Sequence, residues 1–180
     1  DAPWMVTAFK RDGQTPGMLM RDSKGRGFIL KLDVPQHPEL ASAAEVIGSR
    51  FFHAMGYNVT ASYVVRFTAS QLKTASGAVV ELPGRRRRPM TDADIRSFLR
   101  LEAGERDGTY RAVAVRSVPG VPLGPFRLSD TRKDDPNDIV PHGHRRELRG
   151  YGVFAAWLNH VDAKAINSLD TLVTVNGHSF

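Results

Sequence analysis

The sequence predicts an α+β protein with two lobes, and three patterns in its 180 residues carry this prediction. Two runs of strand-forming residues, 17–21 and 27–34, flank the turn-rich segment 22–26 and predict a β-hairpin. Apolar residues then recur at helical spacing over 39–55. The segment 119–125 is rich in Pro and Gly, which predicts a break between the lobes.

The N-terminal lobe is expected to span residues 1–118 as a small antiparallel sheet with one packed helix. Further strands are predicted over 59–67 and 110–118 from β-branched, aromatic and alternating residues. Between them lies an Arg-rich insertion, 68–109, in which a capping-box pattern predicts a short helix over 91–101.

The C-terminal segment, 126–180, is expected to begin a partly helical lobe after a hinge at 119–125 without regular structure. A helix is predicted over 144–158, with Trp157 as an anchor in its core. Residues 172–177 predict a strand that runs into a hairpin turn whose return strand is missing.

Composition and charge limit the classes of partner. The formal net charge of +6 favours acidic partners, and Arg85–Arg88 supplies much of the excess. We interpret this run as a solvated turn, because no aromatic residues interleave with it to stack on single-stranded nucleic acid. The absence of cysteine excludes thiol catalysis and thiolate metal sites. No apolar run approaches the roughly 20 residues of a membrane span.

The segment 159–167 is the most informative stretch for function. It places Asp162, Lys164 and Asn167 directly after the predicted helix. Protein kinases use this spacing in their catalytic loop, where the Asp takes the proton of the substrate hydroxyl and the Asn holds a metal ion. The loop therefore predicts phosphoryl transfer, provided that the other parts of such a site precede it in order.

Lys31 and Glu45 supply the next part. Lys31 lies among apolar neighbours on the predicted strand, and Glu45 lies among apolar residues of the following helix. A charge in such surroundings requires a partner, and each residue can satisfy the other. A strand Lys held by a helix carboxylate can hold nucleotide phosphates. The alternative is that Lys31 extends to solvent from an edge strand and that Glu45 also faces water.

The order of strand Lys, helix Glu, Pro/Gly break, helix and Asp-x-Lys-x-x-Asn resembles the protein-kinase-like fold. In detail it is closer to the atypical HipA-type and spore-coat-type kinases than to eukaryotic kinases. The segments 141–150 (PHGHRRELRG) and 157–160 (WLNH) resemble those of a bacterial family with such a core, often exported. The resemblance covers roughly residues 13–175, and it leaves open whether the protein is cytoplasmic or exported.

The resemblance implies ATP and magnesium as cofactors. Lys31 would contact the α- and β-phosphates and pair with Glu45, and Asn167 would ligate magnesium. The segment from Gly13 to Gly17 would cover the phosphates, although it departs from Gly-x-Gly-x-x-Gly.

The same resemblance assigns the catalytic roles. Asp162 would be the base that orients the acceptor hydroxyl, and Lys164 would neutralise charge on the transferred phosphoryl group. The acceptor would be a hydroxyl of a protein or of a small molecule. Kinases carry a second metal-binding Asp one hairpin after this loop, and the sequence ends at Phe180 inside the expected hairpin. Asp170 lies too early for that role, so we expect a complete site to need residues beyond Phe180.

Two other functions stay open at this point. A kinase-like scaffold could hold nucleotide weakly or not at all and act as a binding module. Alternatively, the chain could bind nucleic acid or an anionic surface through Arg85–Arg88. A His-rich metal site at His142 and His144 is set aside, because the pair precedes a helix in a Pro/Gly context. The acid-rich segment 134–138 is interpreted as a polar turn, since it lacks the ligand spacing of an EF-hand.

Overall fold

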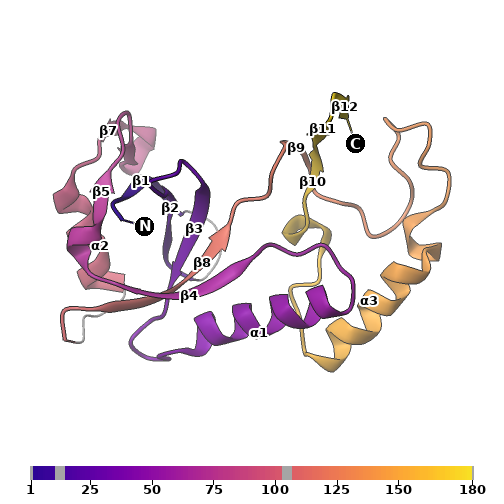
Figure 1. Cartoon of the computed structure of the whole chain (residues 1–180), viewed down its shortest axis with the longest axis horizontal. Coiled ribbons are helices and arrows are strands. Elements are labelled where there is room, and N and C mark those ends of the chain that lie inside the picture. The colour runs from indigo at the N-terminus through magenta and orange to yellow at the C-terminus, as the bar shows by residue number, and fades with distance from the viewer. Residues whose placement is uncertain (1, 11–14, 103–106, 180) are drawn as a thin grey trace. The chain divides into compact units, whose positions relative to one another are not determined.

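The chain folds into two compact units in a computed structural model that describes residues 2–10, 15–102 and 107–179. Unit 1 is Asp1–Ser117 and unit 2 is Val118–Phe180 (Figure 1). Within these described residues, unit 1 contains a mixed sheet and two α-helices, and unit 2 contains one α-helix with short β-ladders. The predicted α+β class is confirmed.

The centre of unit 1 is a sheet in which six strands are described, in the order β4-β8-β3-β2-β1-β5. Neighbouring strands are antiparallel, except that β1 and β5 run parallel. The strands are β1 Trp4–Phe9, β2 Gly17–Arg21, β3 Gly27–Leu32, β4 Ser62–Phe67, β5 Leu72–Thr74 and β8 Tyr110–Arg116. The predicted hairpin is confirmed as β2 and β3, whereas β1 and β5 were not predicted.

Two helices of unit 1, α1 (Leu40–Ala54) and α2 (Asp92–Glu102), contact different parts of this sheet. Successive side chains of a strand point to opposite faces, so Leu30 and Leu32 of β3 face one way and Lys31 the other. Leu30 and Leu32 pack in the cluster that includes residues of α2, whereas Lys31 pairs with Glu45 of α1. The sheet therefore separates an apolar face from a face that carries charge.

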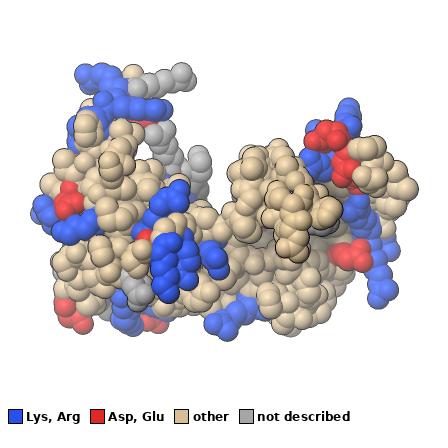
Figure 2. All heavy atoms as spheres, turned by 45° about the horizontal axis from the view of Figure 1, so that its top comes forward, with Lys and Arg blue, Asp and Glu red and all other residues tan. Residues whose placement is uncertain are grey.

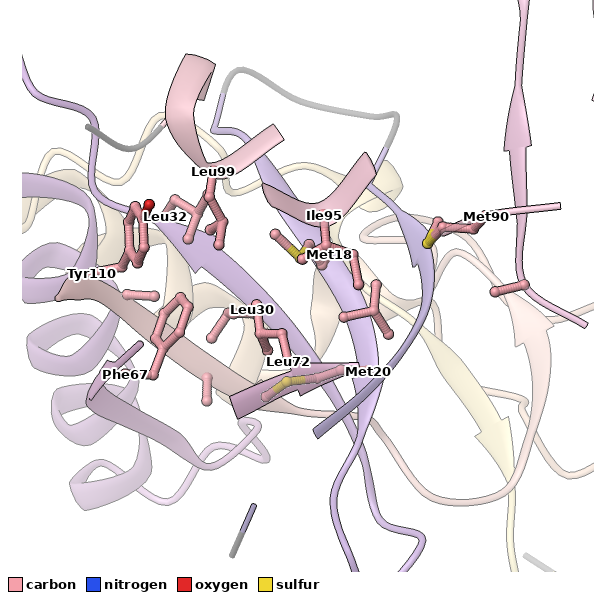
Figure 3. Close-up of a cluster of buried hydrophobic side chains, with 14 residues drawn as sticks. Met18, Met20, Leu30, Leu32, Phe67, Leu72, Met90, Ile95, Leu99 and Tyr110 are labelled. Carbon is pink, nitrogen blue, oxygen red and sulfur yellow. The ribbon is translucent and has the colours of Figure 1, made fainter. Parts of the chain in front are cut away.

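The hydrophobic core of unit 1 lies on the apolar face of the sheet. Figure 3 shows Ile95 and Leu99 of α2 beside Met18, Leu30 and Leu32 of the strands. Leu30, Leu32 and Leu99 are fully buried. Burial of a Leu or Ile side chain contributes about 1.5–3 kcal/mol, so this cluster is the main source of stability in unit 1.

The start of α2 confirms the predicted capping box. The backbone N–H of Thr91 donates to Asp94 at 2.8 Å, and the Thr91 hydroxyl accepts from the Asp94 N–H at 3.4 Å. The Arg88 guanidinium makes two hydrogen bonds to the same carboxylate, at 2.6 and 2.7 Å, and holds the pKa of Asp94 well below its usual range. Both effects stabilise the first turn of α2.

The second half of the arginine run lies in a strand rather than in a turn. Arg87 lies in β7 (Arg87–Pro89), which pairs with β6 (Val79–Glu81). Its side chain forms an ion pair with Glu81 at 3.3 Å, and Arg88 pairs with Asp94. The prediction of a turn is therefore wrong for these two residues, which lie in a strand, although both side chains are exposed. On the face drawn in Figure 2, Lys and Arg side chains appear in several separate places, with acidic side chains beside some of them.

Unit 2 is built on α3 (Arg146–Trp157) and on a short ladder between β9 (Val121–Gly124) and β10 (Asp170–Leu172). The prediction that 119–125 lacks regular structure is therefore wrong, because β9 lies inside that segment. The predicted strand at 172–177 is also corrected. β10 ends at Leu172, and β11 (Thr174–Val175) has a return strand, β12 (His178–Ser179).

Burial in unit 2 is sparse. Among its described residues, Ala155 and His142 are buried. Trp157 is 72% exposed, so the prediction that it anchors the core of its unit is wrong. The described helices include none that is long and apolar enough to cross a bilayer.

Candidate functional site

Lys31 and Glu45 form the predicted ion pair. The Lys31 ammonium donates to Glu45 Oε2 at 2.6 Å, and the two side chains are 26% and 29% exposed. A charge-assisted contact of this length in a partly desolvated place is stronger than an ordinary surface pair. The alternative in which both residues face solvent is not what the structure shows.

The position of Lys31 follows from the sheet. It lies in β3, between β2 and β8, opposite Gly17 on one side and Val113 on the other. A central strand has little freedom to move, so the ammonium is presented from a rigid base. Glu45 lies one turn inside α1, and the turn at 35–39 returns the chain so that α1 contacts β3.

Gly17 has a structural reason to be glycine. A Cβ atom added there would lie 2.3 Å from the carbonyl oxygen of Leu30, closer than packed atoms allow. The expected phosphate-covering segment begins at Gly13, which lies outside the described residues. Near Gly17, the Lys10 ammonium donates a hydrogen bond to the Thr15 carbonyl at 2.6 Å. Gly17 itself belongs to β2, where the absence of a side chain leaves room for the Leu30 carbonyl of β3.

A second polar contact joins β3 to α1, and the sequence interpretation missed it. Asp33, one residue after β3, accepts from the backbone N–H of Ser42 at 2.8 Å and from its hydroxyl at 2.6 Å. Arg111 of β8 reaches the same carboxylate at 3.4 Å. Asp33 and Ser42 are buried. The available signal was the Lys-x-Asp spacing, because it places both side chains on one face of the strand.

The loop of unit 2 that carries Asp162, Lys164 and Asn167 is held by its own backbone. The Asn167 amide nitrogen donates to the Asp162 carbonyl at 3.0 Å, and the Lys164 ammonium lies 3.7 Å from an Asp162 carboxylate oxygen. The Asn167 N–H donates to the Lys164 carbonyl at 2.9 Å, which closes the short helix Ala165–Asn167. These three residues are therefore brought together. The Asp162 and Lys164 side chains are 68% and 62% exposed.

Asp170 has a structural partner in unit 2. Its carboxylate accepts from Arg132 at 3.2 Å, at the start of β10. Arg132 also pairs with Asp134, at 2.7 Å, and this pairing lowers the pKa of Asp134. Asp170 thus ties the start of β10 to the acid-rich loop.

A buried polar cluster of unit 2, formed around His142 and Asp138, was not predicted from the sequence. His142 is 1% exposed; its Nε2 lies 2.7 Å from Asp138 Oδ2, and its ring stacks on Phe126 at 4.5 Å. The other ring nitrogen, Nδ1, lies within hydrogen-bonding distance of the Arg127 carbonyl. His142 is thus a buried residue at the start of the short helix His142–His144, and the predicted polar turn ends in the partly buried Asp138 that contacts it.

Asp138 is the hub of this cluster. It accepts from the backbone N–H of Arg132 at 2.6 Å and from the Arg145 guanidinium, in addition to its contact with His142. The Arg132 N–H is the main reason that the pKa of Asp138 is lowered, and His142 and Arg145 act in the same direction against the effect of burial. Its carboxylate is therefore ionised at neutral pH.

The described residues offer a limited set of ligands for magnesium. No three His, Cys, Asp or Glu side chains gather among them as a metal site would require. The nitrogen of the Asn167 amide is used by the Asp162 carbonyl, which leaves its oxygen as the atom that could bind a cation. Magnesium commonly takes one or two protein oxygens and completes its shell with phosphate oxygens and water, so Asn167 fits such a role.

A shallow hollow of about 350 Å³ in unit 1 lies away from Lys31. Its lining comes from α2, β8 and the short helix Ala69–Gln71, and includes Arg96, Arg100 and Tyr110. Tyr110 belongs to the apolar cluster, so the hollow lies on the α2 side of the sheet. Lys31 and Glu45 lie on the other face of the sheet, so the hollow is separate from their ion pair.

The predicted residues thus form two groups. Lys31 and Glu45 pair in unit 1, and Asp162, Lys164 and Asn167 cluster in unit 2. Comparison of the chain with known protein families, with curated proteins and with solved structures found no match. The resemblance to kinases therefore rests on the residues and their order.

Proposed function

We propose that this chain is the core of an ATP- and magnesium-dependent phosphotransferase with a kinase-like fold. The observation that carries the proposal is the 2.6 Å ion pair between Lys31 on a central strand and Glu45 on the helix that packs against it. Phosphoryl transfer needs positioned positive charge more than covalent chemistry from the protein. A strand ammonium held in place by a helix carboxylate supplies such charge.

The proposed roles of the two groups are complementary. Lys31 binds phosphate oxygens of the nucleotide, and Glu45 fixes the direction of its ammonium. Asn167 offers its amide oxygen to magnesium, which neutralises the phosphate charge when bound. In unit 1 the protein thus provides a fixed cation, and in unit 2 an oxygen ligand.

Asp162 and Lys164 would act on the acceptor. Asp162 would accept a hydrogen bond from the hydroxyl of a protein or small-molecule acceptor and take its proton as the hydroxyl oxygen bonds to the γ-phosphorus of ATP, while the bond from that phosphorus to the β,γ-bridging oxygen breaks and ADP leaves. Lys164, two residues on, places positive charge near the transferred phosphoryl group. The exposure of both side chains leaves them accessible to an acceptor from solvent.

Calorimetric titration with ATP, with and without magnesium, tests the proposal. Saturable magnesium-dependent binding is expected for the wild type, and Lys31→Ala should weaken it about tenfold or more, because a charge-assisted contact contributes about 1.5–3 kcal/mol. Asn167→Ala should reduce the dependence on magnesium. Lys73→Ala is the matched control, since Lys73 is a strand lysine of unit 1 that pairs with Asp92 at 3.5 Å on the surface.

The titration separates the proposal from the other two functions. Binding without transfer of phosphate to any hydroxyl acceptor would indicate a nucleotide-binding scaffold. Polyanion binding that falls steeply with salt and survives Lys31→Ala would indicate the basic-surface function. A folded wild type without magnesium-dependent ATP binding, or equal losses in Lys31→Ala and Lys73→Ala, would contradict the phosphotransferase assignment.

A further inference from the structure

The contact between Asp33 and Ser42 runs beside the contact between Lys31 and Glu45. Lys31 and Asp33 are two residues apart on and just beyond β3, so they share one face. Ser42 and Glu45 are three residues apart on α1, so they share one side of the helix. The two contacts therefore lie side by side and join the same strand to the same helix. The chain directions of the strand and the helix are opposite, so Lys31 meets Glu45 and Asp33 meets Ser42.

The Asp33 link is the more deeply buried of the two. Ser42 is 0% exposed and the Asp33 side chain is 5% exposed, compared with 26% for Lys31. A buried carboxylate must be compensated by donors, and the Ser42 N–H, its hydroxyl and Arg111 supply them. Arg111 also lies 3.4 Å from Glu39, the residue before α1. The start of α1 is thus tied to β3 and β8.

Apolar packing fixes this part of α1 only in part, through half-buried side chains such as Ala43 and Val46. Its buried residues are Ser42 and Phe52, and Phe52 lies two turns beyond Glu45. Leu40 and Ile47 are 63% and 64% exposed. The first two turns of the helix, which include Glu45, are therefore positioned by the polar links more than by side-chain packing.

We propose that Asp33 and Ser42 are positioning residues that set the distance between Glu45 and Lys31. Loss of their contact would let the start of α1 move from β3, and Glu45 would leave the Lys31 ammonium. The geometric part of the proposal stands on the contacts alone, and its effect on nucleotide binding rests on the proposed function.

The experiment compares Ser42→Ala with Thr74→Ala. Thr74 makes the same kind of contact elsewhere, since its N–H and hydroxyl both donate to Asp92 of α2 at 2.8 Å. The first readout is the rate at which an amine-acylating reagent modifies Lys31, measured by mass spectrometry. An amine nitrogen that contacts a carboxylate at 2.6 Å is less accessible to the reagent than one that extends freely into solvent. Glu45→Gln sets the rate for a broken pair.

Ser42→Ala is expected to raise the Lys31 modification rate by about threefold or more and to weaken magnesium–ATP binding by about fivefold, since one hydrogen bond contributes about 1 kcal/mol. Asp33→Asn should act in the same direction, and it replaces Ser42→Ala should that variant not fold. Thr74→Ala should leave both readouts within about 1.5-fold, although it loses a comparable hydrogen bond.

The two readouts distinguish the possible failures. Faster Lys31 modification in Ser42→Ala with no ATP binding by the wild type would support the positioning role and overturn the proposed function. Wild-type ATP binding with equal readouts in Ser42→Ala and Thr74→Ala would overturn the positioning role and leave the proposed function intact. Unchanged modification in both Ser42→Ala and Asp33→Asn would likewise overturn the positioning role.

Discussion

Unit 1 buries a continuous apolar cluster between its sheet and α2, whereas unit 2 buries an imidazole against a carboxylate and, among its described residues, little else. Apolar burial is non-directional and insensitive to charge, whereas a polar cluster depends on the ionisation of each member. The two groups of proposed site residues are therefore attached to units that are stabilised by different kinds of interaction.

The difference extends to the site residues themselves. Lys31 projects from a central strand whose neighbouring side chains are fully buried. Asp162 lies in a loop beside Val161 and close in sequence to Ile166, which are 72% and 78% exposed. We expect the first group to keep its geometry under conditions in which the second group loses it. The predictions below test this difference, starting with the largest effect.

Leu30→Ala should destabilise unit 1 by about 3 kcal/mol, because it leaves a cavity in a fully packed cluster. The control is Val153→Ala in unit 2, where the side chain is 68% exposed and the expected change is below about 0.5 kcal/mol. Urea unfolding, followed by amide exchange in each unit, measures both values. Comparable losses from the two substitutions would show that the apolar cluster does not distinguish the units.

His142→Phe should destabilise unit 2 by about 2 kcal/mol. A phenyl ring keeps the stacking on Phe126 but loses the contacts of the two ring nitrogens with Asp138 and with the Arg127 carbonyl, and each buried hydrogen bond contributes about 1 kcal/mol. His144→Phe is the control, because His144 is exposed in the same short helix. Amide exchange in α3 reports the effect. A stability of His142→Phe equal to that of the wild type would remove the basis for a polar core in unit 2.

Acid should unfold unit 2 before unit 1. The folded-state pKa values of Asp138 and Asp134 are lowered by hydrogen bonds from Arg132. The pKa of Asp94 in unit 1 is lowered too, but the apolar cluster that stabilises unit 1 does not titrate, whereas the buried cluster of unit 2 depends on the Asp138 carboxylate. A lowered folded-state pKa contributes stability above the unfolded-state value of about 4, and this stability is lost as pH falls through the folded-state pKa. Amide correlation spectra between pH 6 and pH 2 should show loss of dispersion in residues 126–172 first. Earlier loss in unit 1 would reverse the comparison.

Gly152→Ala should give the smallest effect and the opposite sign. Gly152 lies inside α3 with no atom within 4 Å of an added Cβ, so alanine should stabilise unit 2 by about 0.5–1 kcal/mol through helix propensity. Gly17→Ala should instead destabilise unit 1, because the added carbon would meet the Leu30 carbonyl. Thermal unfolding of the two variants measures both signs.

The sequence predicted best where local pattern and environment agree. The β2–β3 hairpin and α1 were predicted because their apolar spacing is regular. The Lys31–Glu45 pair was predicted because each charge stands among apolar neighbours. Nucleotide binding by this pair is a proposal, and the position of Lys31 on a central strand of the sheet supports it.

The contacts and the strand that were not predicted from the sequence have physical causes in common. Asp33 lies at the end of the predicted strand run, and the Lys-x-Asp spacing indicates its face of the strand but not its partner Ser42, nine residues further on. The burial of His142 was not predicted, because its partner Asp138 lies in a segment of polar turn residues. β9 was missed because its pairing with β10 joins residues more than forty positions apart. In each case the contact depends on tertiary structure rather than on periodicity.

The place of β8 in the sheet has a consequence for how the chain acquires its structure. β8 inserts between β3 and β4, although it follows β3 by almost eighty residues. During synthesis, β4 has no neighbour in the sheet until Tyr110–Arg116 has been made. Pairings between such distant segments form slowly, because a long loop must close before they contribute. The strand that holds Lys31 therefore gains its second neighbour late, and insertion of β8 is the step that we expect to limit the folding rate of unit 1.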